Sequence, residues 1–306
     1  MCQALALFYL AIAMVVNSSQ ANTIHPRMMP RLGLGRCGAT ITWTTLFESN
    51  AVKCKATECC TYKEACDRLP RAEAHAKALI AALRKIAPIP QGASILDVGA
   101  AQGRFLIGCA RMGFDAVGVE PWDQAREIAA VLASEAGVHI GVLSGRAESL
   151  PFPDACFDLV HAGSVIEHVK DVRASFAEAF RVLKPGGVYW FFTASSMCPI
   201  QQEISGFPLF GWYPDALKRR IMLWAMNNRP RLVGMSKSPA LNWFTPGKAR
   251  RLLTEAGFVR IHDRWDLASP SGRAAQKALS IIRSNRLVRM LANIAVSGCA
   301  YAAVKK

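Results

Sequence analysis

The stretch 94–105 has the residue types and the spacing of a ligand-binding turn. Residues 94–98 are mostly β-branched or aliphatic, which is typical of a strand buried on both faces. Asp97, Gly99 and Gly103 follow the pattern D-x-G-x-x-x-G, in which two glycines bracket a turn that leads into an amphipathic helix. A helix N-terminus at such a turn presents unpaired backbone N–H groups and a partial positive charge. We therefore expect the turn to bind an anionic group.

A carboxylate further along the chain adds a second binding group. Residues 115–120 form another short apolar run, which ends at Glu120. A carboxylate at the end of the second strand of a βαβ unit, about 20 residues beyond the first turn, can accept hydrogen bonds from both hydroxyls of a ribose. The turn and Glu120 together predict a nucleoside-binding site.

The spacing of the glycines separates two classes of nucleoside cofactor. A dinucleotide-binding turn reads G-x-G-x-x-G, and its middle glycine lets the backbone approach a pyrophosphate. The turn at 97–103 lacks this glycine. A nicotinamide-dependent oxidoreductase, which would share the strand, the turn and Glu120, is therefore the less favoured alternative.

Three further motifs follow in order, at residues 145–152 (GRAESLPF), 157–169 (FDLVHAGSVIEHV) and 181–187 (RVLKPGG). With the turn they resemble the class I S-adenosylmethionine-dependent methyltransferases, over roughly residues 72–195. The similarity is greatest to the methyltransferase type 11 branch, which includes ubiquinone-biosynthesis methyltransferases. The resemblance implies an enzyme that uses S-adenosyl-L-methionine to methylate an oxygen, nitrogen or carbon of a small-molecule acceptor.

The resemblance also implies roles for single residues. The turn would hold the methionine end of the cofactor, Glu120 the ribose, and residues 147–148 the adenine edge, while Ser164 would line the reaction centre. The cofactor-binding residues implied in this way are Asp97, Gly99, Ala101, Gly103, Glu120, Pro121, Ala147, Glu148 and Ser164. No metal site is implied.

His168 is the candidate catalytic residue. It follows the expected strand 157–162, and ligands bind beyond the carboxyl ends of the strands in sheets of this kind. An imidazole titrates near neutral pH, so it can accept a proton from a substrate hydroxyl or amine. A structural role as a cap or helix residue is the alternative. His161, inside the strand, is expected to pack against the sheet.

The alternation of apolar runs and amphipathic segments predicts an α/β fold. The resemblance makes it Rossmann-like, with a seven-stranded, mostly parallel sheet, helices on both faces and an antiparallel last strand. The expected strands cover residues 94–98, 115–120, 138–143, 157–162, 188–193, 258–267 and 297–305. The expected helices cover residues 72–87, 105–112, 124–135, 172–183, 217–226, 246–256 and 271–293.

The chain is expected to contain five segments. They are an N-terminal extension (1–50), a Cys-rich lead-in (51–71), the cofactor-binding core (72–196), an aromatic and basic insertion (197–243) and the C-terminal part of the core (244–306). The insertion is well placed to close over a substrate and exclude water, or else to pack against the core or a second subunit. Within the last segment, residues 271–293 form a basic amphipathic helix. Such a helix can lie on an anionic membrane, although packing back on the core is the commoner outcome.

The positive charge is concentrated in the last third of the chain. The net charge is +15, and residues 197–306 carry 18 basic and 5 acidic side chains. This indicates an acidic partner, such as a phosphorylated or carboxylated substrate, a membrane surface or nucleic acid, or else a solvated basic face. A small acidic or lipophilic acceptor fits the aromatic insertion and the basic last third best. A non-catalytic module that binds nucleic acid or membrane is the second alternative. A nucleic-acid partner is disfavoured because no RNA-binding signature with interleaved aromatic residues occurs.

The cysteines and the N-terminal segment give information on the cellular location of the protein. Cys54, Cys59, Cys60 and Cys66 cluster without C-x-x-C pairs or accompanying histidines, so ordinary thiols are favoured over a metal site or disulfides. Residues 4–16 are apolar but too short to span a bilayer. The first 50 residues resemble a signal or transit peptide or an over-extended start, and we expect them to lie outside the fold. A cytoplasmic location is favoured because the cofactor is made there, with an organellar or exported location as the alternative.

Overall fold

The fold is built on one seven-stranded sheet, described here from a computed structural model that covers residues 56–199, 201, 203–233 and 238–306. The strand order is β3-β2-β1-β4-β5-β7-β6. Neighbours pair in parallel from β3 to β5, and β7 pairs antiparallel with β5 and β6. The strands are β1 (Ser94–Val98), β2 (Asp115–Val119), β3 (Gly141–Leu143), β4 (Phe157–Gly163), β5 (Leu183–Thr193), β6 (Arg260–Asp263) and β7 (Cys299–Val304). The predicted Rossmann-like sheet with its antiparallel last strand is confirmed.

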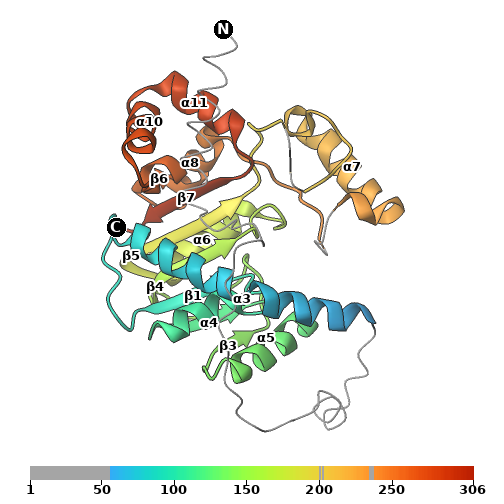
Figure 1. Ribbon diagram of the computed structural model, residues 1–306, viewed down its shortest axis with the longest axis vertical. Helices are drawn as coiled ribbons and strands as arrows, with labels where there is room; N and C mark the ends of the chain where they lie inside the picture. The colour runs from blue at the N-terminus through green and yellow to red at the C-terminus, as the bar shows by residue number, and fades with distance from the viewer. Residues whose placement is uncertain (1–55, 200, 202, 234–237) are drawn as a thin grey trace, which may run out of the picture.

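Helices cover both faces of this sheet (Figure 1). They are α3 (Ala56–Leu83), α4 (Arg104–Arg111), α5 (Asp123–Glu135), α6 (Val172–Val182), α7 (Asp215–Asn228), α8 (Pro246–Glu255), α9 (Arg264–Leu267), α10 (Arg273–Ser284) and α11 (Arg286–Ala295). Short 3-10 helices lie at Phe210–Trp212 and Pro230–Leu232. None of the helices within the described residues is both long and apolar enough to cross a membrane.

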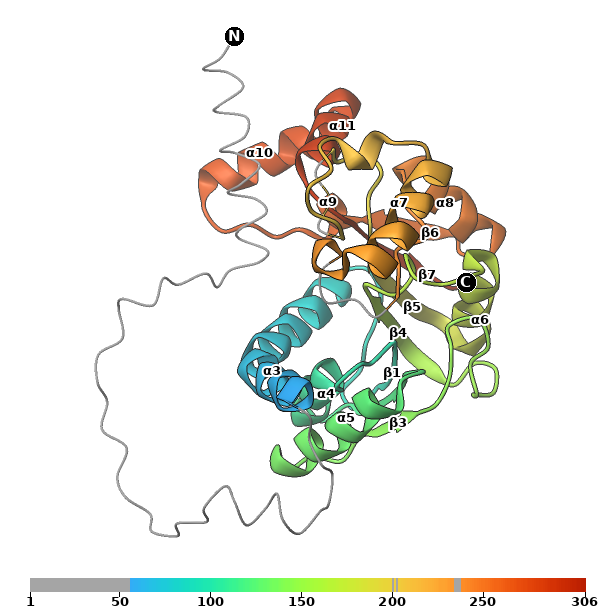
Figure 2. The ribbon, with the colours of Figure 1, turned by 90° about the vertical axis from the view of Figure 1, so that its right-hand side faces the viewer.

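Two cores form because successive strand residues point to opposite faces. On one face, Leu96, Val160 and Phe191 pack with α6 and α8. On the other face, Ile95 and Leu159 pack with α3 and α4. Figure 2 shows the sheet between these two helical layers, with α3 on its left and α6 and α8 on its right.

Strands β1 and β4 are neighbours in the middle of the sheet. The chain winds from β1 through β2 to β3 in one direction, and from β4 to β5 in the other. The point where the winding reverses is where ligands bind in open α/β sheets.

Several boundaries differ from those expected. Strand β3 begins at Gly141 instead of residue 138, and β5 begins at Leu183 instead of residue 188. The first helix begins at Ala56 instead of residue 72, with Pro70 inside it. The sixth strand ends at Asp263, where α9 starts, and was expected to continue to residue 267. The segment 271–293 forms two helices separated at Asn285, because this side chain caps α11. Residues 1–50, 234–237 and Cys54 lie outside the described residues.

Candidate functional site

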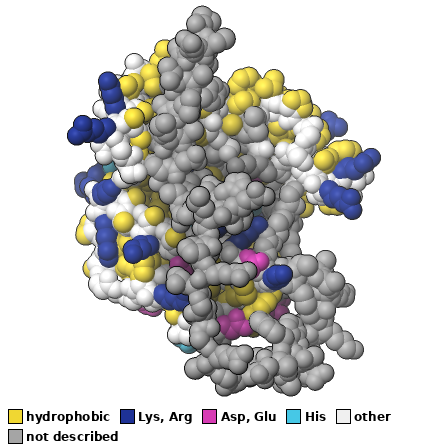
Figure 3. Space-filling model, viewed as in Figure 1, with side chains coloured by type: hydrophobic (Ala, Val, Ile, Leu, Met, Phe, Trp, Pro, Cys, Tyr) yellow, Lys and Arg dark blue, Asp and Glu magenta, His cyan; other side chains and the backbone are white. Residues whose placement is uncertain are grey.

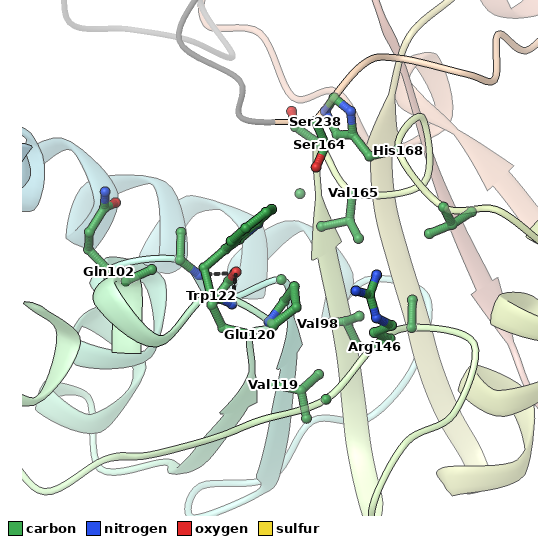
Figure 4. A pocket seen from close by; sticks show the side chains of 18 of the residues that line it. Val98, Gln102, Val119, Glu120, Trp122, Arg146, Ser164, Val165, His168 and Ser238 are labelled. Carbon is green, nitrogen blue, oxygen red and sulfur yellow. Dashed lines mark hydrogen bonds between the residues drawn. The ribbon is translucent and has the colours of Figure 1, made fainter. Parts of the chain in front are cut away.

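A cavity of about 640 Å³ lies beyond the carboxyl ends of β1, β2 and β4. It lies where the order of the strands reverses between β1 and β4. From the sequence, ligands were also expected beyond the carboxyl ends of the strands. Seven of the nine predicted cofactor-binding residues line the cavity, together with His168. The seven are Gly99, Ala101, Glu120, Pro121, Ala147, Glu148 and Ser164. Figure 4 shows side chains from the ends of β1 and β2 and from the segment that follows β4 around the cavity.

The turn after β1 is held against the end of β2 by its own backbone. The N–H groups of Gly99 and Ala100 donate to the carbonyl of Val119, at 2.8 and 3.0 Å. Gly99 has a φ of 71°, and a Cβ there would lie 2.4 Å from a methyl carbon of Val165. Glycine is therefore required both by the backbone conformation and by the close approach of β4's loop. Ala101 also has a positive φ, of 46°, which is strained for a residue with a side chain.

Glu120 connects the turn to the cavity wall. Its buried carboxylate accepts hydrogen bonds from the backbone N–H of Ala101 at 2.9 Å and of Trp122 at 3.1 Å. Burial raises the pKa of this carboxyl above its usual value, and the two hydrogen bonds oppose the shift. A carboxylate can accept about four hydrogen bonds, so Glu120 retains capacity for two ligand hydroxyls. This donor set fits the two hydroxyls of a ribose.

Asp97 and Gly103, the other two predicted residues, do not line the cavity. The Asp97 carboxylate is buried, with one oxygen 2.6 Å from His161 Nδ1. The ring of His161 stacks between Phe105 and Trp190, at centroid distances of 3.8 and 4.8 Å, so this histidine packs against the sheet as expected. Asp97 therefore links β1 to β4 through its contact with His161, and Gly103 caps the start of α4 with a φ of 69°.

The loop after β3 forms another wall. Ala147 is buried, and a carboxylate oxygen of Glu148 accepts from the backbone N–H of Lys170 at 2.8 Å. This bond ties the loop to the segment that follows β4. Arg146 lies beside them with its guanidinium toward the cavity (Figure 4).

His168 and Ser164 line the opposite end of the cavity. Ser164 follows β4 with a φ of 58°, and its backbone N–H donates to the carbonyl of Phe192 at 2.9 Å. Nδ1 of His168 lies 3.0 Å from the carbonyl oxygen of Pro239. Because a carbonyl only accepts, Nδ1 carries the proton of the neutral ring and Nε2 keeps a lone pair. Burial lowers the pKa of His168 below 6.5, although the Pro239 hydrogen bond opposes this. The ring is thus a candidate proton acceptor.

Several cavity residues lie outside the sequence motifs. Arg68 comes from α3, and Ser238, Pro239 and Leu241 come from the end of the 197–243 insertion. No local pattern marks them, because they reach the cavity through packing between segments far apart in sequence. Arg146 lies within the motif 145–152 and Lys170 directly follows the motif 157–169, so both cations could have been considered from the sequence.

The residues present fit S-adenosyl-L-methionine. The volume lies within the range of about 300–1,000 Å³ that small-molecule sites occupy. One end offers the carboxylate of Glu120, and the other offers an imidazole nitrogen beside the loop from the insertion. A nucleoside and a smaller acceptor can thus be placed in one continuous space.

Comparisons with known proteins agree with the motifs. Residues 96–191 match the family described as "Methyltransferase domain". A ubiquinone biosynthesis O-methyltransferase of Paramagnetospirillum magneticum is 37% identical over 99 residues, which are 32% of this chain and 39% of that protein. The uncharacterized methyltransferase YcgJ of Bacillus subtilis is 36% identical over 94 residues, 30% of this chain and 37% of that protein.

The matched segment is shorter than either chain. Over it, the chain spans about two fifths of the length of the relatives it matches. A solved structure of the Bacillus subtilis YcgJ protein covers 73% of this chain and 96% of its own, with 18% identity and a TM-score of 0.47. Residues 96–191, which contain the four motifs, therefore match a methyltransferase family model.

Proposed function

We propose that this protein is an S-adenosyl-L-methionine-dependent methyltransferase with a small-molecule acceptor. The observation that carries the proposal is the position of Glu120. Its buried carboxylate reaches the same cavity as the glycine turn after β1, at the winding reversal of the sheet. This is the geometry that holds a ribose beside an anion-binding turn.

The cofactor, when bound, supplies a methyl group already activated by a sulfonium. The chain therefore has mainly to align the reactants and exclude water. In this proposal Glu120 accepts the ribose hydroxyls, the backbone of Gly99 and Ala101 borders the methionine end, and Ala147 and Glu148 border the adenine. Asp97 acts indirectly, because its contact with His161 fixes the strand that precedes the turn.

The acceptor would occupy the end of the cavity near His168. Its Nε2 can remove a proton from a hydroxyl or amine as the methyl group is transferred, which favours an O- or N-nucleophile. Ser238, Pro239 and Leu241 border this end, which supports a substrate-closing role for the insertion. An acidic acceptor is supported by the excess of basic over acidic side chains in residues 197–306, which include the segment that borders this end of the cavity. We also propose a cytoplasmic location, since the cofactor is made there.

Isothermal titration calorimetry tests the cofactor assignment without knowledge of the acceptor. The ligands are S-adenosylmethionine and its demethylated product, S-adenosylhomocysteine. We expect saturable binding of both to the full chain. Glu120→Gln should weaken binding roughly 10- to 100-fold, because one or two charge-assisted hydrogen bonds to the ribose are lost.

Glu127→Gln is the matched control, because Glu127 lies exposed on α5, outside the cavity. This variant should bind S-adenosylmethionine and S-adenosylhomocysteine with the same affinity as the unmodified protein. If the folded protein bound neither ligand, or if Glu120→Gln bound both as tightly as Glu127→Gln, the proposed site would be wrong. Binding of a nicotinamide dinucleotide in their place would support an oxidoreductase.

A further inference from the structure

One face of α11 is apolar and largely exposed, and only Ile294 on it is partly buried. Four of its side chains recur at spacing i, i+3, i+4 and i+7, and they are Leu287, Met290, Leu291 and Ile294. Leu287 is 62% exposed, Met290 43% and Leu291 42%. Ile281, near the end of α10, is 46% exposed. We call these five residues the apolar stripe. Exposed apolar side chains that line one helix face indicate a binding surface more strongly than scattered ones do.

The opposite face of α11 fixes the direction of the stripe. Val288 and Ala292 pack with Leu279 and Ile282 of α10 and with Trp265 of α9. This small core uses the inward face of both helices. The stripe points outward because its helix is already packed on the other side.

Polar contacts hold the α10–α11 hairpin in place. Arg283 donates to the backbone carbonyls of Trp265, Asp266 and Ala268, each at 2.9 Å. Arg289 donates to the carboxylates of Asp263 and Asp266. The apolar stripe therefore belongs to an element that is anchored to the rest of the fold. Arg283 and Arg289, two of the five basic residues of the hairpin, are used in these contacts.

The other three cations are available to a partner. Arg273 and Lys277 lie exposed on α10, and Arg286 lies exposed at the start of α11. Within the described part of the chain, none of the three has a side-chain hydrogen bond or ion pair. Residues 268–306 contain no Asp or Glu. In Figure 3, basic and hydrophobic side chains lie together at the upper left, where Figure 1 shows α10 and α11.

We propose that the apolar stripe, with Arg273, Lys277 and Arg286, docks the protein on the surface of an anionic lipid bilayer. A helix that lies in the bilayer interface inserts its apolar face among the acyl chains while flanking cations contact anionic headgroups. Arg273 and Lys277 share the face of α10 that carries Ile281, because the three residues are spaced four apart. The proposal does not depend on the proposed catalytic activity.

Two other partners fit the surface less well. A second copy bound across a twofold axis would bring the cations of one hairpin against those of the other, without a carboxylate to pair them. A nucleic acid would match the cations, but single strands stack on aromatic side chains. The stripe is aliphatic, with Leu, Met and Ile only.

Vesicle co-sedimentation of the full chain tests the proposal. One set of vesicles contains phosphatidylcholine alone, and the other contains equal parts of phosphatidylglycerol and phosphatidylcholine. We expect binding to the anionic set only, weakened by added salt. Leu287→Ser/Leu291→Ser should reduce the partition coefficient by about tenfold or more. Lys277→Gln/Arg286→Gln should reduce it by about fivefold per cation.

Matched controls change the same residue types elsewhere. Val131→Ser/Val259→Ser alters apolar residues that are 49% and 59% exposed, and Lys63→Gln/Lys77→Gln alters exposed cations of α3. Both should bind like the unmodified protein. Equal binding to neutral vesicles, or binding unaffected by the two leucine changes, would overturn the proposal. So would a dimer in analytical ultracentrifugation that Leu287→Ser/Leu291→Ser dissociates, because a second copy would then cover the stripe.

Discussion

His168 has one ring nitrogen occupied by the protein and the other available to a substrate. The Pro239 carbonyl fixes the tautomer, since it requires a proton on Nδ1. Burial lowers the pKa of the ring below 6.5, so the neutral form predominates at pH 7. A neutral imidazole with a fixed tautomer can act as a general base, whereas a protonated one cannot.

The pKa of His168 can be measured before the acceptor is known. We expect its NMR titration to give a value below 6.5, identified by the resonance that disappears in His168→Gln. Once an acceptor is found, turnover should rise with pH through this value, because protonation blocks the base. His168→Gln should lose this dependence and lower turnover by about 10²- to 10⁴-fold, with cofactor affinity unchanged. A pKa above 6.5 would contradict the assignment.

Glu167, next to His168, is a buried acid with a different role. One of its carboxylate oxygens accepts from Thr193 Oγ1 at 2.8 Å. Burial raises the pKa of Glu167 from 4.5 to about 7, and the hydrogen bonds oppose the shift. The folded protein therefore binds more protons than the unfolded chain between pH 4.5 and about 7. Its stability should fall as the pH rises through this window.

Glu167→Gln should remove this dependence while keeping an oxygen that can accept from Thr193. At pH 8 we expect the variant to have a free energy of unfolding larger by about 1–3 kcal/mol, because no buried carboxylate has to ionise. At pH 5 the two proteins should differ little. Urea unfolding at both pH values measures this, with Glu127→Gln as an exposed control. A variant less stable than the unmodified protein at pH 8 would contradict the prediction.

Helix α4 directly follows the cofactor turn, and Gly103 is the residue that caps its start. This residue has a φ of 69°, and a Cβ added to it would lie 2.9 Å from Ile140 Cδ1 and 3.0 Å from Ala129 Cβ. Gly137 has a similar φ of 66°, but a Cβ there would meet nothing within 4 Å. Substituting alanine at each glycine therefore separates two contributions to the free energy of unfolding. Gly137→Ala introduces backbone strain alone, and Gly103→Ala introduces backbone strain and a steric clash.

Gly137→Ala should lower the free energy of unfolding by about 1 kcal/mol, through the positive φ alone. Gly103→Ala should lower it by about 1–3 kcal/mol more, since Ile140 and Ala129 must also move. Urea unfolding of the two variants gives the difference directly. Equal losses would show that the close contacts around Gly103 relax without cost.

The elements predicted best from the sequence are those whose local residue pattern and tertiary packing favour the same secondary structure. The strand β1, the turn and α4 are of this kind, because apolar runs and glycines determine them. The end of β6 was mispredicted because Asp263 accepts from the backbone N–H groups of Trp265 and Asp266 and so begins α9. Asn285 divides the last amphipathic segment in the same way. Both boundaries were missed because the capping residues Asp263 and Asn285 lie within stretches whose apolar residues recur at regular spacing.

The site could be predicted only where motifs carry it. The D-x-G-x-x-x-G pattern did not reveal that the Asp97 carboxylate contacts His161 and does not line the cavity. Its direction follows from strand alternation and from the pairing of β1 with β4, which sets Asp97 opposite His161. Ser238 and Pro239 reach His168 from about 70 positions away, as the hydrogen bond between His168 and Pro239 shows. Tertiary packing alone brings them together.

At the scale of the whole molecule, the cavity joins parts of the chain that otherwise have separate cores. Its walls come from α3, from the strand ends and from the insertion that contains α7. The insertion packs in a cluster of its own with Phe210, Met222 and Trp243. A ligand in the cavity would contact all of these parts. Its binding free energy should therefore stabilise the whole fold and not one segment.

Thermal unfolding in the presence of ligand tests this coupling. At about 100 times its dissociation constant, a ligand that binds only the folded state adds roughly 2.7 kcal/mol of stability. For a chain of this size, we expect S-adenosylhomocysteine to raise Tm by about 5 °C or more in a single shifted transition. Glu120→Gln should show a much smaller shift at the same concentration, and a nicotinamide dinucleotide should give none. If the transition split in two, with only one part shifted, the insertion would unfold independently of the site. That outcome would remove the insertion from the ligand-binding unit, because a segment that closes over a bound ligand must share its stabilisation.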